Sequence, residues 1–275
     1  METMPYSRPE SFQVPSRIGP VGGLLLASGS APVGRTWIWL LHGHGAGAHD
    51  TRPLLAALAE ATQRGQLPEL AVAVPDGPWL DRGSWWVDTA LPVETALLQD
   101  VLPAVEGSLG DRPSPVRRCV AGISMGGAAA LRWALAHHDL FGSAALLSPA
   151  VYETPPPDSS ARTTGAFGAG PDRFVERRWH ETMDFRALLA SRERSGPVTR
   201  VATVVGDREP AQDGGDGAAA DLDLQAVRLH AALKRHPRIR SSLRIVGGGH
   251  DQATWARHIA EVVGRAVGQG LCHPH

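Results

Sequence analysis

One serine of the chain lies in a sequence typical of a catalytic nucleophile. Ser124 is the centre of a Gly-x-Ser-x-Gly pattern with Gly122 and Gly126, after an apolar run and before a helix-like run rich in alanine. That strand–turn–helix context is the one in which a nucleophile elbow occurs. Small neighbours let the tight turn close, and the following helix directs its N-terminal N–H groups toward an oxyanion formed at the serine. The pattern predicts acyl transfer through Ser124; the alternative is a glycine-rich turn without chemistry.

A base that activates this serine is expected at His250. A hydroxyl group is a weak nucleophile and needs an adjacent base. His250 follows the apolar run 243–246 and a turn of three glycines, and it precedes a helix-like segment. Loops at the C-terminal ends of strands hold the functional groups of an open α/β sheet. We therefore expect this histidine, among the twelve of the chain, to take the proton of the serine; a surface loop histidine is the alternative.

The acid that orients the imidazole is expected at Asp207. This residue follows the apolar run 198–205 and one glycine. The chain order Ser124, Asp207, His250 is that of α/β-hydrolase triads, in which a carboxylate orients the imidazole and stabilises its charged form. Glu209 lies two residues further along the same turn and is the alternative acid.

Two backbone N–H groups are predicted to form an oxyanion hole. The first belongs to Met125, the residue after the nucleophile. The second is assigned to His44, within the segment 42–47 (His-Gly-His-Gly-Ala-Gly) that follows the apolar run 36–41. Small residues at this point let the backbone approach a ligand closely.

The same segment has a rival interpretation as a metal site. A His-x-His pair with a nearby carboxylate is a ligand pattern of some zinc hydrolases, here from His42, His44, His49 and Asp50. The glycines separate His49 too far from the pair for a compact ligand set, so we expect no metal.

The elements that must position these residues alternate between strand-like and helix-like runs. Alternation of this kind predicts the α/β class, with a mostly parallel central sheet flanked by helices on both faces. The expected strands are 21–27, 36–41, 70–74, 116–123, 143–147, 198–205 and 243–246. The expected helices are 52–64, 92–108, 126–137, 218–234 and 252–267, with a kink or break at Pro103 in the second.

The composition limits the class of protein. The chain has 275 residues, 43% of them hydrophobic, and its 27 basic and 28 acidic side chains give a formal net charge of −1. That balance favours one globular domain, residues 1–275, and gives no electrostatic case for a nucleic-acid partner. No apolar run is long enough to span a bilayer. Two cysteines are no disulfide framework, and no convincing signal peptide precedes the first strand, so we expect a cytoplasmic protein.

Three further segments bear on the site or its surroundings. The stretch 154–172, rich in proline, glycine and serine, is expected to be a long loop or lid, and 268–275 a flexible tail. Tryptophans gather after the expected strand 70–74, where flat apolar side chains can line a substrate pocket. Packing of that loop onto the body of the protein is the equally weighted alternative. The pocket residues expected from these loops are Trp79, Trp85, Trp86 and Phe167.

With these pieces assembled, the chain resembles the putative-esterase family of the α/β-hydrolase fold, which includes esterase D, feruloyl esterases, enterochelin-type esterases and the antigen 85 mycolyltransferases. The resemblance implies carboxyl-ester or thioester chemistry, no cofactor, and a Ser/Asp/His triad. It rests on Leu41-His42-Gly43-His44, Leu102-Pro103, Gly122-Ile123-Ser124-Met125-Gly126-Gly127, Leu147-Ser148-Pro149, Gly206-Asp207, and Gly249-His250-Asp251 with Trp255.

The function predicted from these features is hydrolysis of a small-molecule carboxylic ester or thioester through an acyl-enzyme on Ser124. An acyltransferase with an alcohol or amine acceptor is the first alternative, because water access rather than the triad selects between the two. A catalytically inactive binding module is the second. Substrate, acyl chain length and oligomeric state do not follow from the sequence, because a fold does not supply a substrate.

Overall fold

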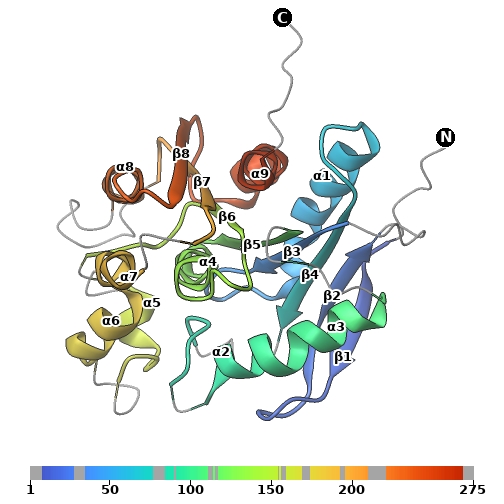
Figure 1. Cartoon of the computed structure of the whole chain (residues 1–275), viewed down its shortest axis with the longest axis horizontal. Helices are drawn as coiled ribbons and strands as arrows, with labels where there is room; N and C mark the ends of the chain where they lie inside the picture. Colours follow the sequence, from blue (N-terminus) through green and yellow to red (C-terminus); the bar gives the residue numbers. More distant parts are fainter. Residues whose placement is uncertain are drawn as a thin grey trace, which may run out of the picture.

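The computed structural model describes residues 8–27, 35–76, 84–89, 91–110, 114, 117–153, 155, 159–168, 174–192, 196–209 and 221–268. Within these residues eight strands form one sheet in the order β1-β2-β4-β3-β5-β6-β7-β8 (Figure 1). The strands are β1 (Glu10–Val14), β2 (Val21–Ala27), β3 (Thr36–Leu41), β4 (Leu70–Asp76), β5 (Arg118–Ile123), β6 (Ser143–Leu147), β7 (Thr199–Gly206) and β8 (Ile239–Val246).

The sheet is parallel from β4 to β8, and β2 runs antiparallel to both of its neighbours, β1 and β4. Parallel strands need crossover connections, and those connections here carry the helices that cover the sheet. The carboxyl ends of β3, β5, β6, β7 and β8 therefore meet at one edge of the sheet. This is the edge at which open α/β sheets bind ligands.

Both faces of the sheet are buried, which explains why its strands are apolar runs rather than alternating ones. On β3, Trp37 and Trp39 face one core and Ile38 and Leu40 the other. The second core is closed by α1 (Arg52–Gln63) and α9 (Gln252–Val267), which lie next to each other in Figure 1. The first core is closed by α2 (Val93–Ala96), η3 (Leu97–Val101), α3 (Leu102–Ser108), α4 (Met125–Ala136), α6 (Glu176–Met183), α7 (Phe185–Ser191) and α8 (Leu222–Leu233).

The break expected at Pro103 appears as a change of helix type. A proline inside a helix lacks the N–H for an i→i−4 bond, and its ring clashes with the carbonyl one turn earlier. Here η3 is a π-helical turn between α2 and α3, and the N–H of Leu102 donates to the carbonyl of Leu97. This wider turn lets the polypeptide continue as one helical segment past the proline.

The expected strands and long helices are present, and the structure adds elements that the sequence did not predict. Strand β1 lies in a stretch whose prolines and polar residues gave no strand signal. The expected loop 154–172 contains a short helix, α5 (Ser160–Thr163), and much of that loop, like residues 269–275 of the expected tail, lies outside the described residues. None of the described helices is long and apolar enough to cross a membrane.

Candidate active site

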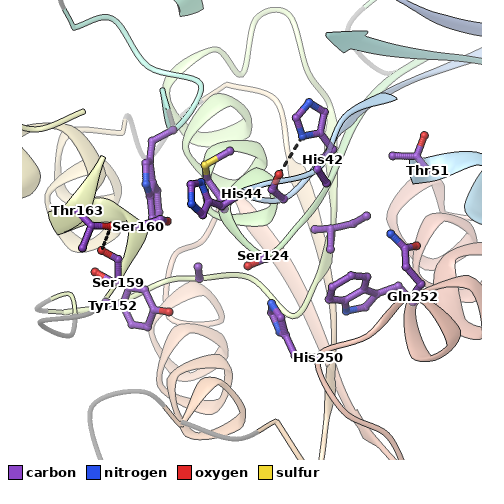
Figure 2. A pocket seen from close by; sticks show the side chains of 17 residues that line it. His42, His44, Thr51, Ser124, Tyr152, Ser159, Ser160, Thr163, His250 and Gln252 are labelled. Atoms are coloured by element: carbon purple, nitrogen blue, oxygen red, sulfur yellow. Dashed lines mark hydrogen bonds between the residues drawn. The ribbon is translucent and has the colours of Figure 1, made fainter. Parts of the chain in front are cut away.

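Five loops at the carboxyl edge of the sheet converge on one cavity of about 220 Å³. The cavity is lined from β3 by His44, from β5 by Ser124 and from β8 by His250, and Figure 2 shows the imidazole of His250 pointing toward Ser124. Backbone hydrogen bonds hold neighbouring loops together. Ser124 N–H donates to the carbonyl of Leu147 at 3.0 Å, and Asp207 N–H to that of Val246 at 2.8 Å. Backbone hydrogen bonds to neighbouring strands therefore fix the positions of the site loops.

Ser124 is held in a backbone conformation that an L-residue rarely adopts. Its φ is 52° and its ψ −116°, and it immediately precedes α4. A strained conformation of this kind costs roughly 1–3 kcal/mol and persists only where the surroundings enforce it. The sharp turn places the serine between the end of β5 and the start of α4, where its side chain lines the cavity.

The two glycines of the motif are required by close backbone contacts. A Cβ at Gly122 would lie 2.0 Å from the carbonyl oxygen of Gly126, and a Cβ at Gly126 would lie 2.1 Å from that of Leu41. Neither position has room for a side chain. The turn closes against α4 and against the end of β3, which brings Ser124 to the oxyanion segment.

The carboxylate that contacts His250 is Glu209. His250 Nδ1 lies 3.2 Å from Glu209 Oε2, and the glutamate side chain is fully buried while the imidazole is 24% exposed. The other carboxylate oxygen accepts hydrogen bonds from Gly206 N–H at 2.8 Å and from the Ser148 hydroxyl. A buried carboxylate must be paired and hydrogen-bonded to remain charged, and Glu209 meets that condition.

The expectation that Asp207 orients the imidazole is corrected by this geometry. Asp207 Oδ1 accepts from Gly248 N–H at 3.0 Å, and its side chain is 48% exposed. It joins the loop after β7 to the loop after β8. The alternative acid, two residues further on, turns inward and reaches the histidine.

Two residues that the sequence analysis did not assign to the site support the acid. Ser148, at the end of β6, is 1% exposed and has a φ of 45°. Its hydroxyl donates to Glu209 Oε1 and accepts from the indole N–H of Trp255 at 2.9 Å. Trp255 also packs edge-on against His250, with ring centroids 4.9 Å apart. Both residues were part of the family resemblance, but no local pattern indicated their contact.

The structure brings the predicted oxyanion residues together. Met125 is the first residue of α4, so its N–H has no acceptor within the helix. Both His44 and Met125 line the cavity beside Ser124. Burial lowers the pKa of the His44 imidazole, which therefore presents a neutral ring at neutral pH.

Only one of the described aromatic residues expected in the pocket lines the cavity. Trp85 lines the cavity. Trp86 and Phe167 do not line the cavity, which corrects that expectation. The indole N–H of Trp86 donates to the carbonyl of His42 at 3.2 Å. Phe167 packs against Trp85, with ring centroids 5.9 Å apart. Both serve to fix the loops to the body, as apolar rings in buried loops commonly do. Trp79 lies outside the described residues.

The histidines of the rival metal interpretation do not converge. His42 is buried, and its Nδ1 lies 2.9 Å from the carbonyl oxygen of Gly43. His49 instead contacts the guanidinium of Arg52 on the surface. Over the described parts of the chain, no three side chains of the His, Cys, Asp and Glu types gather into a ligand set.

The parallel sheet, the strained serine and the His–carboxylate pair together define the chain as an α/β-hydrolase. The family model described as "Putative esterase" matches residues 88–266, and the chain belongs to this family. It is an esterase, and small-molecule esters are the substrates of its class.

Three solved structures share this fold. A ferulic acid esterase matches with a TM-score of 0.73 and 15% identity over 96% of this chain and 99% of that one. An S-formylglutathione hydrolase from Agrobacterium tumefaciens matches with a TM-score of 0.71 and 15% identity, over 97% of this chain and 99% of that one. The enterobactin esterase of Shigella flexneri matches with a TM-score of 0.64 and 20% identity, over 95% of this chain and 60% of that one. No curated protein sequence matches the chain.

Proposed function

We propose that the chain hydrolyses small carboxylic esters or thioesters through an acyl-enzyme on Ser124, with His250 as the base and Glu209 as the acid. The observation that carries the proposal is the contact between the buried Glu209 carboxylate and the partly exposed His250 imidazole, beside the strained serine at the N-terminus of α4. A nucleophile, a base and an orienting carboxylate in this order form the triad arrangement of acyl transfer.

In the proposed reaction, Ser124 Oγ attacks the carbonyl carbon while its proton passes to His250 Nε2. Glu209 accepts a hydrogen bond from His250 Nδ1–H and stabilises the imidazolium that forms. The backbone N–H groups of His44 and Met125 donate to the oxyanion of the tetrahedral intermediate. The proton then moves from the imidazolium to the leaving alcohol or thiol, and a water molecule releases the acid by the same steps.

The size of the cavity supports small acyl groups. Pockets for drug-sized ligands occupy about 300–1,000 Å³, and the volume here is about 220 Å³. We therefore expect acetyl to butyryl esters to be turned over faster than long-chain esters.

The test is hydrolysis of p-nitrophenyl esters from acetyl to long acyl by the wild type and Ser124→Ala side by side. The wild type is expected to hydrolyse the short esters, and the variant to lose several orders of magnitude in kcat/KM. Equal activity of the two proteins would exclude Ser124 as the nucleophile. Added alcohol acceptors distinguish hydrolysis from acyl transfer, because a transferase forms the new ester in place of the free acid.

A further inference from the structure

The wall of the cavity contains buried polar atoms without partners. Trp85 Nε1 and Ser159 Oγ have no hydrogen-bond partner among the described residues, and the two side chains belong to residues only 1% and 4% exposed. Both residues line the cavity that holds Ser124. His42 Nε2 and Gln252 Oε1, from two other lining residues, also have no hydrogen-bond partner among the described residues. Buried polar groups in folded proteins are almost always hydrogen-bonded, so unpaired ones in a ligand cavity indicate a partner that the protein does not itself supply.

Aromatic packing links Trp85 to the segment of the chain that follows Ser159. The ring of Trp85 packs against Trp179 and Phe167, with ring centroids 5.2 and 5.9 Å apart. Phe167 follows α5, the short helix that Ser159 precedes directly. Figure 2 shows Ser159 on the side of the cavity opposite Gln252, with Ser124 between them.

The chemistry of this side selects the ligand group that can occupy it. An indole N–H only donates a hydrogen bond, and a hydroxyl can donate as well. No lysine or arginine is among the described residues that line the cavity, and partial desolvation lowers the pKa of the His44 imidazole, which favours its neutral form. A carboxylate would be buried there without a countercharge, at high cost. The complementary group is a neutral oxygen.

We propose that the part of the ester that fills this side carries a hydroxyl, ether or carbonyl oxygen, which accepts hydrogen bonds from Trp85 Nε1–H and Ser159 Oγ–H. The inference rests on the proposed function and narrows its substrate class from esters in general to esters with an oxygen-bearing substituent. A pure hydrocarbon group would leave both donors unpaired when it displaces water from the cavity. Sites built to hydrogen-bond a substrate group discriminate strongly against the analogue that lacks it.

The test uses pairs of esters of equal size that differ by one oxygen. In the acyl series, p-nitrophenyl methoxyacetate is compared with p-nitrophenyl butyrate. In the alcohol series, 2-methoxyethyl acetate is compared with butyl acetate. Each ratio of kcat/KM values is divided by the ratio of the hydroxide-catalysed rates, because the extra oxygen also changes the intrinsic reactivity of the ester.

In the wild type, we expect the corrected ratio to favour the oxygen-bearing ester by about tenfold in at least one series, the effect of a hydrogen bond of ordinary strength. Trp85→Phe and Ser159→Ala are each expected to lower this ratio, and the double variant to bring it to about one. Trp179→Phe is the matched control. Its indole N–H is also buried and without a partner among the described residues, but Trp179 does not line the cavity, so the ratio stays at its wild-type value.

The outcomes separate the inference from the function on which it rests. Turnover that depends on Ser124, with a corrected ratio near one in both series, overturns the inference and leaves the proposed function standing. A preference that Trp85→Phe and Ser159→Ala do not change overturns it as well. No turnover that depends on Ser124 with any of the four esters overturns both.

Discussion

Two carboxylates follow the end of β7 within three residues, and their surroundings are opposite. Glu209 is buried, with hydrogen bonds to His250, Gly206 and Ser148. Asp207 is half exposed and accepts a hydrogen bond from Gly248 N–H. In the proposed mechanism, only Glu209 can stabilise an imidazolium at His250. Asp207 joins the loop after β7 to the loop after β8, and its hydrogen bond goes to Gly248 rather than to the imidazole.

Substitution of each carboxylate by its amide separates these roles. Glu209→Gln is expected to lower kcat by about 10³–10⁴-fold, because an amide cannot stabilise the imidazolium and favours the wrong tautomer. Asp207→Asn is the matched control, and its kcat is expected to fall by less than about tenfold, since the amide oxygen still accepts from Gly248 N–H. Steady-state kinetics with p-nitrophenyl acetate measure both. A larger loss in Asp207→Asn than in Glu209→Gln would reverse the assignment.

In the proposed mechanism, Ser148 and Trp255 are positioning residues that act through the acid. Ser148→Ala removes one hydrogen bond from the Glu209 carboxylate, and Trp255→Phe keeps a ring against His250 but removes the indole N–H. These hydrogen bonds hold the Glu209 carboxylate in position beside His250. We therefore expect both variants to lower kcat/KM by roughly 10-fold, measured by steady-state kinetics with p-nitrophenyl acetate.

A second buried serine on the same strand provides the control for this pair. Ser143 begins β6 and is 4% exposed, far from the carboxylate at the other end of the strand. Ser143→Ala is expected to leave kcat/KM at its wild-type value. A wild-type kcat/KM in Ser148→Ala and Trp255→Phe would show that the two residues do not position the acid.

At the scale of the elements, the loop that carries His250 is fixed by the helix after it. Asp251 is the N-cap of α9: its Oδ1 accepts from Thr254 N–H at 2.9 Å and its Oδ2 from the Thr254 hydroxyl at 3.2 Å. An N-cap carboxylate satisfies an orphan N–H and interacts favourably with the helix dipole. Since the cap is the residue next to His250, the start of α9 sets where the imidazole lies.

Asp251→Ala is expected to lower the free energy of unfolding by about 1 kcal/mol at neutral pH. The hydrogen bond from Thr254 N–H lowers the pKa of Asp251 below its usual 3.8. A lowered folded-state pKa means that the stabilisation is fully present above the unfolded-state value and is lost as pH falls through the folded-state value. The difference between wild type and variant is therefore expected to hold down to about pH 5 and to shrink below about pH 4.

Urea unfolding at a series of pH values measures this difference. Asp251→Asn is the control, because an asparagine caps a helix about as well as aspartate but carries no charge. It is expected to retain most of the stability at neutral pH. A wild-type advantage over Asp251→Ala that persists unchanged below pH 3 would show that the carboxylate charge plays no part in the cap.

Local pattern was sufficient to predict the strands from β2 to β8 and the long helices, but not β1 or α5. It was also sufficient to single out the two residues with the clearest context. Ser124 lies between a strand and a helix, and His250 lies between a strand and a helix, so each could be placed from its own neighbours. The acid could not, because the loop after β7 holds two carboxylates and backbone direction alone selects between them. The hydrogen bond between Trp255 and Ser148 spans 107 residues, and no local signal reports a contact at that distance. The positions of Trp86 and Phe167 outside the cavity could not be predicted either, because packing and ligand contact require the same kind of side chain.

At the scale of the whole molecule, the sheet explains why residues from distant parts of the chain form one site. Strands β3, β5, β6, β7 and β8 are adjacent or nearly adjacent and parallel, so the loops that follow them emerge at the same edge (Figure 1). Helices on both faces bury the strands and leave this edge open to a ligand. We therefore expect this convergence to activate one serine of the chain, Ser124.

The most direct test is the intact mass of the protein after treatment with a fluorophosphonate, a reagent that labels activated serines. The wild type is expected to gain one adduct, which peptide mapping places on Ser124. Ser124→Ala is expected to gain none, and His250→Ala to react far more slowly, because its serine lacks a base. Labelling of Ser124→Ala at the wild-type rate, or an adduct on another residue, would contradict the account.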